Sequence, residues 1–398
     1  MMICDKALCT GCAACMNVCG VSAISMQRQK NGHYYPVIDP SVCVECGLCQ
    51  RTCPNNREST FHYPIACYIA TAVSDLEAKD STSAGISSAL ERLIIQQGGV
   101  VYGCSGEECT NVKHIKISGE EDIYRLKGSK YVQSFIGNSF KQIKIDLQSG
   151  TKVLFVGTPC QVAGLYSYLG KTVFNLYTID LVCHGVPSQQ ILNDALKEYL
   201  PNILFDGLDV RYRKKIKGKS VYGLFVTDKD GKSLLETRFP KNEYITGFLS
   251  GLYYRERCYR CQYAQEKRVS DITVGDYWDR ENKVTIPNKK GGLSMLIVNT
   301  PKGKELIEKG RQLFHLKEGN YRAFVARNGQ LKHPMPKNKA YDQFAEDYSK
   351  IGFLKAARKN LKDERKRIRK NEFINGIAAI IYAIPGAKSI KKMIRKNG

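Results

Sequence analysis

The sequence predicts a mixed α/β protein, α+β overall, with a cysteine-rich N-terminal segment, an α/β core and a basic helical tail. Three observations predict this organisation. Nine of the 16 cysteines lie in the first 60 residues, strand-like and helix-like segments alternate from about residue 63 to residue 336, and basic residues gather toward the C-terminus. A chain of 398 residues with 43% hydrophobic side chains has globular composition and is long enough for two or three domains.

The N-terminal sequence has no basic segment followed by an apolar one, and no later apolar run reaches the ~18 residues that a membrane span needs. We therefore expect a cytoplasmic protein. A reducing compartment disfavours structural disulfides, so 16 cysteines in such a chain indicate metal or redox chemistry.

The net charge of +23 suggests a nucleic-acid partner at first, but it is unevenly distributed. Residues 351–398 hold 14 Lys/Arg against three Asp/Glu, and residues 211–219, which we interpret as a basic loop, hold six more basic residues. Because the excess is local, the sequence predicts a basic tail and one basic loop, and no nucleic-acid partner.

The strongest motif is the spacing Cys-x2-Cys-x2-Cys-x3-Cys, which occurs twice with equivalent cysteines 34 residues apart. In two-cluster ferredoxins, three cysteines of one run and the last cysteine of the other hold one 4Fe–4S cluster. A pair of zinc sites, whose cysteines are usually spaced differently, is the weaker alternative. The expected ligands are Cys9, Cys12, Cys15 and Cys53 for one cluster, and Cys43, Cys46, Cys49 and Cys19 for the other.

Between the runs the sequence predicts a short β ribbon around residues 33–38, and after them a linker at residues 55–60. The core that follows is expected to contain a partly parallel sheet, because strands and helices alternate. The expected strands are Ala66–Ala72, Val100–Gly103, Lys152–Val156, Tyr177–Val182, Asp271–Val274 and Met295–Thr300. The expected helices are Ile86–Gln97, Val162–Leu169, Gln189–Tyr199 and Lys302–Leu313.

Two of these strands run into loops that carry Cys160 and Cys183. Ligands of open α/β sheets sit at the carboxyl ends of strands, which makes these loops candidates for a site. Together with the pair Cys258 and Cys261, the two cysteines could form a third 4Fe–4S cluster or a zinc site, and spacing does not choose between them. The alternative is that Cys160 and Cys183 are small buried hydrophobic residues.

Loops rich in glycine and hydroxyl groups, at residues 81–85, 128–131 and 157–158, suit the phosphates of a nucleotide. Helix capping and ordinary turns explain such loops more often, and neither a Gly-x-Gly-x-x-Gly motif nor a P-loop is present. His184, His114 and Asp276 are candidates for proton transfer, although a lone histidine is more often structural. The cysteines without evident partners, which we interpret as plain thiols, are Cys4, Cys67, Cys104 and Cys109.

These loops belong to a longer series of characteristic stretches: Ser81–Gly85, Gly128–Ser134, Gly157–Gln161, Asp180–Ser188, Cys258–Cys261 and Ser270–Trp278. Through them, in this order and together with the cysteine runs, about residues 1–300 resemble the coenzyme F420 hydrogenase/dehydrogenase beta-subunit family in its form with an N-terminal two-cluster ferredoxin domain. One departure is Ala84, which stands where we expect glycine.

The resemblance implies an iron–sulfur flavoprotein, in which a ferredoxin-like two-cluster domain is fused to an α/β flavin-binding core. It implies FAD, and it raises the expectation of a third 4Fe–4S cluster on Cys160, Cys183, Cys258 and Cys261. The implied cofactor-binding residues are Ser81, Thr82, Ser83, Gly85, Ser129, Lys130, Tyr131, Gln133, Gly157, Thr158 and Pro159. The implied regions are 1–60 (two-cluster domain), 61–150 (N-terminal domain of the beta-subunit family), 151–336 (its C-terminal flavin and cluster domain) and 337–398 (basic tail).

We expect an iron–sulfur, flavin-dependent oxidoreductase that takes electrons from a ferredoxin or a partner subunit and acts on a soluble small molecule. The substrate would be coenzyme F420 or an intermediate of surface-polysaccharide biosynthesis. One alternative is a non-catalytic electron-transfer subunit of a larger redox complex. Another is a zinc-bearing nucleic-acid or scaffold protein, which the ferredoxin spacing disfavours.

The basic tail lies outside the matching stretches, and beyond Lys337 we expect it to be helical and thin in core residues. Residues 388–396 predict an amphipathic helix with Ile390, Met393 and Ile394 on one face. One interpretation is a helix that rests on the anionic inner face of a membrane, where each Lys or Arg contributes ~1 kcal/mol. The other is a solvated helix packed on the core.

Overall fold

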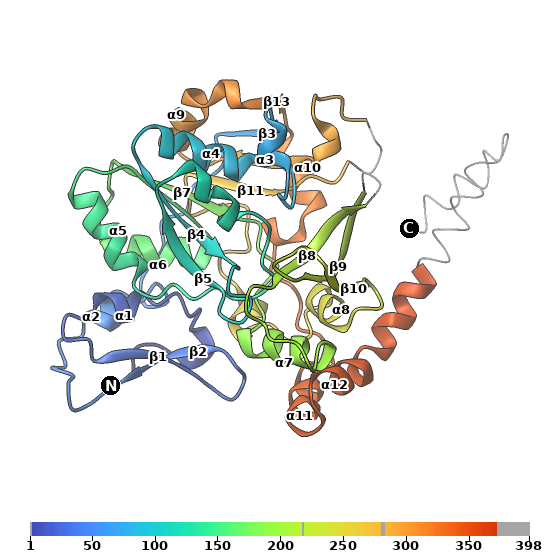
Figure 1. Ribbon diagram of the computed structural model, residues 1–398. Coiled ribbons are helices and arrows are strands. Elements are labelled where there is room, and N and C mark those ends of the chain that lie inside the picture. The colour runs from blue at the N-terminus through green and yellow to red at the C-terminus, as the bar shows by residue number, and fades with distance from the viewer. Residues whose placement is uncertain (1, 217–218, 280–282, 372–398) are drawn as a thin grey trace.

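Eight strands form the central sheet, in the order β13-β3-β12-β11-β7-β6-β4-β5 (Figure 1). The computed structural model describes residues 2–216, 219–279 and 283–371. The central strands β4, β6, β7 and β11 run parallel, and the outer ones are antiparallel. The strands are β3 (Ala66–Ala72), β4 (Val100–Ser105), β5 (Lys113–Ile117), β6 (Val153–Gly157), β7 (Leu176–Leu181), β11 (Ile272–Asp276), β12 (Ser294–Val298) and β13 (Phe314–Glu318). The predicted partly parallel sheet is confirmed, and every strand and helix predicted for the core is present within a few residues of its expected bounds.

Alternate residues of the central strands face opposite sides of the sheet. In β6, Leu154 packs in the core beneath α4 (Ile86–Gln96) and α9 (Pro301–Lys309). Val153 and Phe155 pack in the core beneath α5 (Ser139–Gln148) and α6 (Pro159–Leu169). Helices therefore cover both faces of the sheet, as parallel strands require. Because β6 and β7 are parallel neighbours, the loops that follow them lie side by side at one edge.

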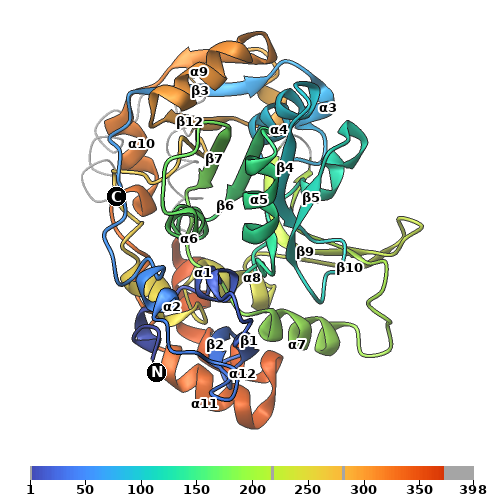
Figure 2. The same cartoon turned by 90° about the vertical axis from the view of Figure 1, so that its left-hand side faces the viewer.

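The N-terminal cysteine-rich region lies beneath α5 and α6 (Figures 1 and 2). It consists of the ribbon β1 (Ile24–Arg28) and β2 (Tyr34–Ile38) and the short helices α1 (Ala14–Val18) and α2 (Leu48–Arg51). Asn17 Nδ2 donates to the carbonyl of Gly137 at 2.8 Å, and Ser167 Oγ donates to the carbonyl of Thr52 at 2.6 Å. The region is therefore packed directly on the core.

A second sheet, which the sequence did not predict, stands beside the central one. It is antiparallel and contains β8 (Asp209–Ile216), β9 (Lys219–Thr227) and β10 (Ser233–Arg238). The interpretation of residues 211–219 as a basic loop is wrong for residues 211–216, which belong to β8, and for Lys219, which begins β9. Val210 and Tyr212 are buried and alternate with Arg211 and Arg213, so this is a half-buried strand whose basic side chains hide its periodicity.

The remaining helices include α3 (Asp75–Ala78), α7 (Gln189–Tyr199), α8 (Glu243–Leu249) and α10 (Tyr321–Arg327). The tail begins with α11 (Tyr341–Ile351) and α12 (Phe353–Asn360), and residues 362–371 are also helical. A tail thin in core residues was expected, and this is wrong as far as residue 361. Phe344, Phe353 and Leu361 are at most 2% exposed and pack with α7 and α8.

The predicted amphipathic helix at residues 388–396 lies outside the described residues. Within the described ranges, no helix has both the length and the apolar character that crossing a membrane requires.

Candidate cluster sites and cofactor pocket

The first site contains Cys9, Cys12, Cys15 and Cys53, which line one cavity. The turns of the run direct backbone N–H groups at sulfur: Gly11 donates to Cys9, Ala14 to Cys12, and Met16 to Cys15. Cys53 accepts from the backbone and the side chain of Asn55. Amide donors stabilise thiolates, the form in which cysteine binds iron, so this donor set fits a 4Fe–4S cluster.

The second site contains Cys43, Cys46 and Cys49, with Cys19 packed in the same group of side chains as Cys49. Cys19 Sγ accepts a hydrogen bond from the backbone N–H of Ala23 at 3.3 Å, and Cys49 accepts one from Gln50. Its donors therefore resemble those of the first site, and they fit a second cluster.

The two runs share an unusual backbone conformation as well as their spacing. The φ angle is positive at Gly11 (+71°) and Ala13 (+61°), and at the equivalent positions Glu45 (+53°) and Gly47 (+71°). A left-handed conformation is costly for a residue with a Cβ atom, and it persists where the surrounding structure requires it. The duplication therefore extends to the loop geometry that turns the thiols inward.

The core site contains Cys160, Cys183, Cys258 and Cys261. Cys160 lies in the first turn of α6, Cys183 follows β7, and the other pair belongs to the 3₁₀ turn at 256–260 and its cap. In every pair among the four thiols, one member lies close enough to raise the pKa of the other. Burial, the largest influence, raises the pKa of Cys160 and of Cys183 to about 12. The structure thus brings together all four cysteines, for which the sequence had left a cluster, a zinc site and simple burial as alternatives.

Donors also surround the core site. Thr158 Oγ1 lies 3.2 Å from Cys160 Sγ, and the backbone N–H of Gly185 donates to Cys183. Cys261 accepts from the backbone of Tyr263 and Ala264. In the part of the chain that the structure describes, no group of three or more His, Cys, Asp or Glu is arranged for a single metal ion. In a 4Fe–4S cluster each iron at a cube corner takes its own thiolate, so the ligands stand further apart than around one ion.

The cysteines interpreted as plain thiols have partners. Cys4 contacts Cys53 and Cys9 and lines the cavity of the first site, so the interpretation of Cys4 as partnerless is wrong. Cys67 Sγ and Cys109 Sγ donate to backbone carbonyls at 3.0 and 3.6 Å. Cys104 lines the pocket described next. Sequence spacing could not reveal these contacts, because they join distant segments.

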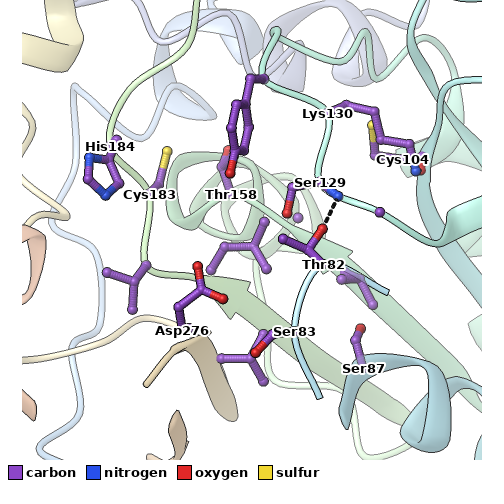
Figure 3. A pocket seen from close by; sticks show the side chains of 18 of the residues that line it. Thr82, Ser83, Ser87, Cys104, Ser129, Lys130, Thr158, Cys183, His184 and Asp276 are labelled. Atoms are coloured by element: carbon purple, nitrogen blue, oxygen red, sulfur yellow. Dashed lines mark hydrogen bonds between the residues drawn. The ribbon is translucent and has the colours of Figure 1, made fainter. Parts of the chain in front are cut away.

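The cofactor pocket is a cavity of about 320 Å³ at the carboxyl ends of β4, β6, β7 and β11. Figure 3 shows Cys183 and His184 on one side of it, and Thr82 and Ser129 on the other. Among the residues implied to bind a cofactor, only Pro159 does not line it; Pro159 is buried in the first turn of α6. The other ten, which do line it, are Ser81, Thr82, Ser83, Gly85, Ser129, Lys130, Tyr131, Gln133, Gly157 and Thr158.

Two helix N-termini meet at this pocket, and they differ in capping. Thr158 and Gln161 form a reciprocal capping box that satisfies the first turn of α6. The N-cap of α4 is Gly85, with φ +77° and no side-chain cap, and the first turn of α4 lines the cavity. Uncapped N–H groups at a helix N-terminus form an anion site, so the α4 end fits a phosphate.

Lys130 does not have the free ammonium group that phosphate binding would use. Its Nζ is buried and donates to the carbonyls of Cys104, Leu126 and Lys127 at 2.8–2.9 Å. Lys130 therefore fixes the loop that carries Ser129, whose backbone N–H in turn donates to Thr82 Oγ1 at 2.6 Å (Figure 3). Lys130 therefore positions the loop, and the neighbouring residues Ser129 and Tyr131 line the cavity.

The proton-transfer candidates occupy different environments. Both ring nitrogens of His114 are engaged, with Val156 O at 3.1 Å and Ser134 Oγ at 3.0 Å, and burial lowers the pKa of His114 to about 4. His114 also lines the pocket, but both of its ring nitrogens already have partners, which favours a structural role. His184 lines the pocket, and burial lowers its pKa although Asp276 acts in the opposite direction. Asp276 forms an ion pair with Arg213 Nη1 at 2.5 Å.

An aromatic wall was missed by sequence reasoning. Tyr131 stacks on Phe248 with centroids 4.4 Å apart and planes 6° from parallel. The Arg213 guanidinium lies over Tyr222 and Trp278, at 4.9 and 5.3 Å from the ring centroids. Tyr131 and Trp278 stood in recognised stretches, but Arg213 and Tyr222 required the sheet β8-β9-β10 to be known, and Phe248 lies in α8.

Glu91 of α4 was missed as well. It is 4% exposed and lines the pocket; Ser87 Oγ donates to its Oε1 at 2.9 Å. Its Oε2 has no hydrogen-bond partner among the described residues. Burial raises the pKa of Glu91 to about 7. In the sequence, Glu91 cannot be distinguished from a charged residue on the solvent-exposed face of a helix.

Fold and sites define an iron–sulfur electron-transfer protein with a candidate cofactor pocket beside the cysteines of the core site. Residues 8–56 match the 4Fe–4S dicluster domain, and residues 150–321 match the family described as the C terminus of the coenzyme F420 hydrogenase/dehydrogenase beta subunit. The chain is therefore similar to the coenzyme F420 hydrogenase/dehydrogenase beta subunit over residues 150–321 and to dicluster ferredoxins over residues 8–56, as the sequence predicted.

Curated relatives come from Methanocaldococcus jannaschii. The chain is 23% identical over 355 residues to a coenzyme F420-dependent sulfite reductase, covering 83% of this chain and 50% of that protein. It is 34% identical over 55 residues to an uncharacterized ferredoxin, covering 14% of this chain and 70% of that protein. The chain spans about half the length of the first relatives it matches. A solved structure of the F420-reducing [NiFe] hydrogenase complex from Methanosarcina barkeri aligns with TM-score 0.42 and 17% identity, over 78% of this chain and 92% of that one.

Proposed function

We propose that this chain is an iron–sulfur, FAD-dependent oxidoreductase, with 4Fe–4S clusters at the first, second and core sites and FAD in the cofactor pocket. The observation that carries the proposal is that Cys160 and Cys183 belong to the core site and also line the cofactor pocket. A flavin supplies the exchange between one-electron carriers and two-electron chemistry.

The three sites form a series from the surface to the pocket. Cys46 of the second site is exposed, and the first site adjoins it within one group of packed side chains. Cys12 lies close to Cys160, and it packs against Gly164 one turn further along α6. The series supports entry of electrons at the second site from a ferredoxin or a partner subunit.

The pocket residues have separable tasks in this proposal. The uncapped first turn of α4 and the hydroxyl groups at residues 81–83 bind the diphosphate. Tyr131 and Phe248 form an apolar wall for a planar ring system. Burial keeps the His184 imidazole neutral at pH 7, so it can accept a proton inside the pocket.

Coenzyme F420 is the first substrate to test, because a relative aligned over 355 residues is named for its dependence on F420. An intermediate of surface-polysaccharide biosynthesis is the second.

The test is anaerobic purification followed by iron, zinc and flavin analysis, then turnover with reduced ferredoxin and each substrate. We expect about twelve irons and one FAD per chain. About eight irons without flavin would contradict the proposal and favour a subunit that only relays electrons.

A further inference from the structure

Arg255 is the buried arginine that joins the N-terminal region to the core. It is 1% exposed and caps the turn that carries Cys258. Its Nη1 donates to the carbonyl of Cys9 at 3.1 Å, and its Nη2 donates to the carbonyl of Tyr34 at 2.6 Å. Its guanidinium also lies over the ring of Tyr35, 4.5 Å from the centroid.

Gln133 completes the connection. Arg255 Nε donates to Gln133 Oε1 at 3.1 Å, and Gln133 Nε2 donates to the carbonyl of Thr10 at 2.9 Å. His33 Nδ1 lies 3.2 Å from the same Oε1, and burial followed by the charge of Arg255 keeps the pKa of His33 well below its usual value. The histidine is therefore neutral, and Arg255 is the cation of this network.

No carboxylate of the described residues pairs with Arg255, whose side-chain partners are carbonyl oxygens and a ring. Arg268, the other fully buried arginine, forms an ion pair with Asp180 at 2.9 Å. A buried cation without an anion is costly, so a folded protein normally supplies one. The candidates here are the thiolates on either side.

Arg255 lies between two of the candidate cluster sites. On one side its guanidinium bonds to the carbonyl of Cys9, and a Cβ atom at Gly11, inside the first run, would meet Arg255 Nη2 at 2.6 Å. On the other side its backbone N–H donates to the carbonyl of Val186, and its own carbonyl accepts from the N–H of Cys258, both at 2.9 Å. Arg255 therefore contacts both the first site and the core site.

We propose that Arg255 is the shared counter-cation of the clusters at these two sites and raises their reduction potentials. The proposal rests on the proposed function, because it requires both clusters. A cluster held by four thiolates is anionic and gains one further negative charge when it accepts an electron. A buried cation nearby favours that reduced state, and low dielectric strengthens the effect. No bond or proton changes at Arg255.

The test uses the full chain with its clusters, and it compares Arg255→Met with wild type by redox titration followed by electron paramagnetic resonance. At a fixed potential we expect the ratio of reduced to oxidised cluster to fall at least tenfold at the first and core sites, a negative shift of about 59 mV. The second site is the internal reference, and its potential should not move.

Arg260→Met is the matched control. It removes the same charge from the same turn, but its side chain is 58% exposed and pairs with Glu256 at 3.6 Å. Water screens such an exposed charge, so the cluster potentials of Arg260→Met should equal those of wild type. Arg255→Lys keeps the positive charge but loses the planar guanidinium. We expect its cluster potentials to lie closer to those of wild type than to those of Arg255→Met.

Unchanged potentials in an iron-loaded Arg255→Met variant would overturn the proposal. If that variant loses iron, Arg255→Gln replaces it and must show the same negative shift. Loss of iron in the Met, Gln and Lys variants alike would show that shape and not charge is required, which also overturns it. Wild type without clusters at both sites would instead refute the proposed function.

Discussion

The two cysteine runs have the same spacing and backbone but different surroundings. In the first, Cys9, Cys12 and Cys15 are each 8% exposed. In the second, Cys46 is exposed and its neighbour Val44 is 65% exposed. The difference comes from residues outside the repeat, because the first run packs against α6 and Arg255 while the second faces solvent. The repeat determines how the thiols converge, and the core determines which site is buried.

The largest expected effect extends the buried side of this comparison to the core site. Cys261→Ser should remove about four irons per chain and leave the clusters of both runs in place. Iron analysis of the folded variant measures this. Cys109→Ser, which changes a buried thiol outside all three sites, is the control and should retain all iron. Unchanged iron in Cys261→Ser would mean that Cys261 is not a ligand.

A smaller effect should separate the two runs through packing alone. A Cβ atom at Gly164 would meet Cys12 Cβ at 2.8 Å and Sγ at 2.9 Å. Gly164→Ala should therefore destabilise the first site by about 1–3 kcal/mol, the usual cost of overpacking. Denaturant unfolding and the spectrum of each cluster measure the effect. Gly20→Ala, whose Cβ meets open space at the end of the first run, should change neither. If both substitutions had equal effects, packing against α6 would not be the cause of the difference between the two runs.

The smallest effect is one of rate. A water-soluble iron chelator should remove about four irons from the second site first, because the buried sites must open locally before they react. Time courses of iron release and of the cluster spectra follow this order. A single rate for all irons would mean that the exposure of Cys46 does not distinguish the sites.

Local patterns predicted much of the molecule. The cysteine spacing was readable because each run folds on itself, and the core strands were readable because their apolar residues are continuous. Strand β8 was missed because the residues that alternate with its buried ones, such as Arg213 and Lys215, are basic and resemble a loop. The tail was misjudged because Phe344 and Phe353 are widely spaced in the sequence, and only their helices bring them together.

The contacts that join distant segments were beyond reach. Arg255 stands between two tyrosines and an ordinary charged turn, and nothing local shows that it reaches Cys9. The four cysteines of the core site come from three separate loops, so spacing alone left a cluster, a zinc site and plain burial as alternatives. The parallel pairing of β6 and β7 brings Cys160 and Cys183 together, and the sequence suggested these strands without their directions.

The packing of Cys12 against Gly164 has a kinetic consequence. A separate ferredoxin must meet its acceptor by diffusion, and its delivery rate depends on how much of it is present. Here the two-cluster region is fixed to the core by buried contacts, so transfer between them is unimolecular and independent of protein concentration. Only the second site, at the exposed end of the series, must meet an electron donor by diffusion. Dilution should therefore slow the supply of electrons without slowing their transfer within the chain.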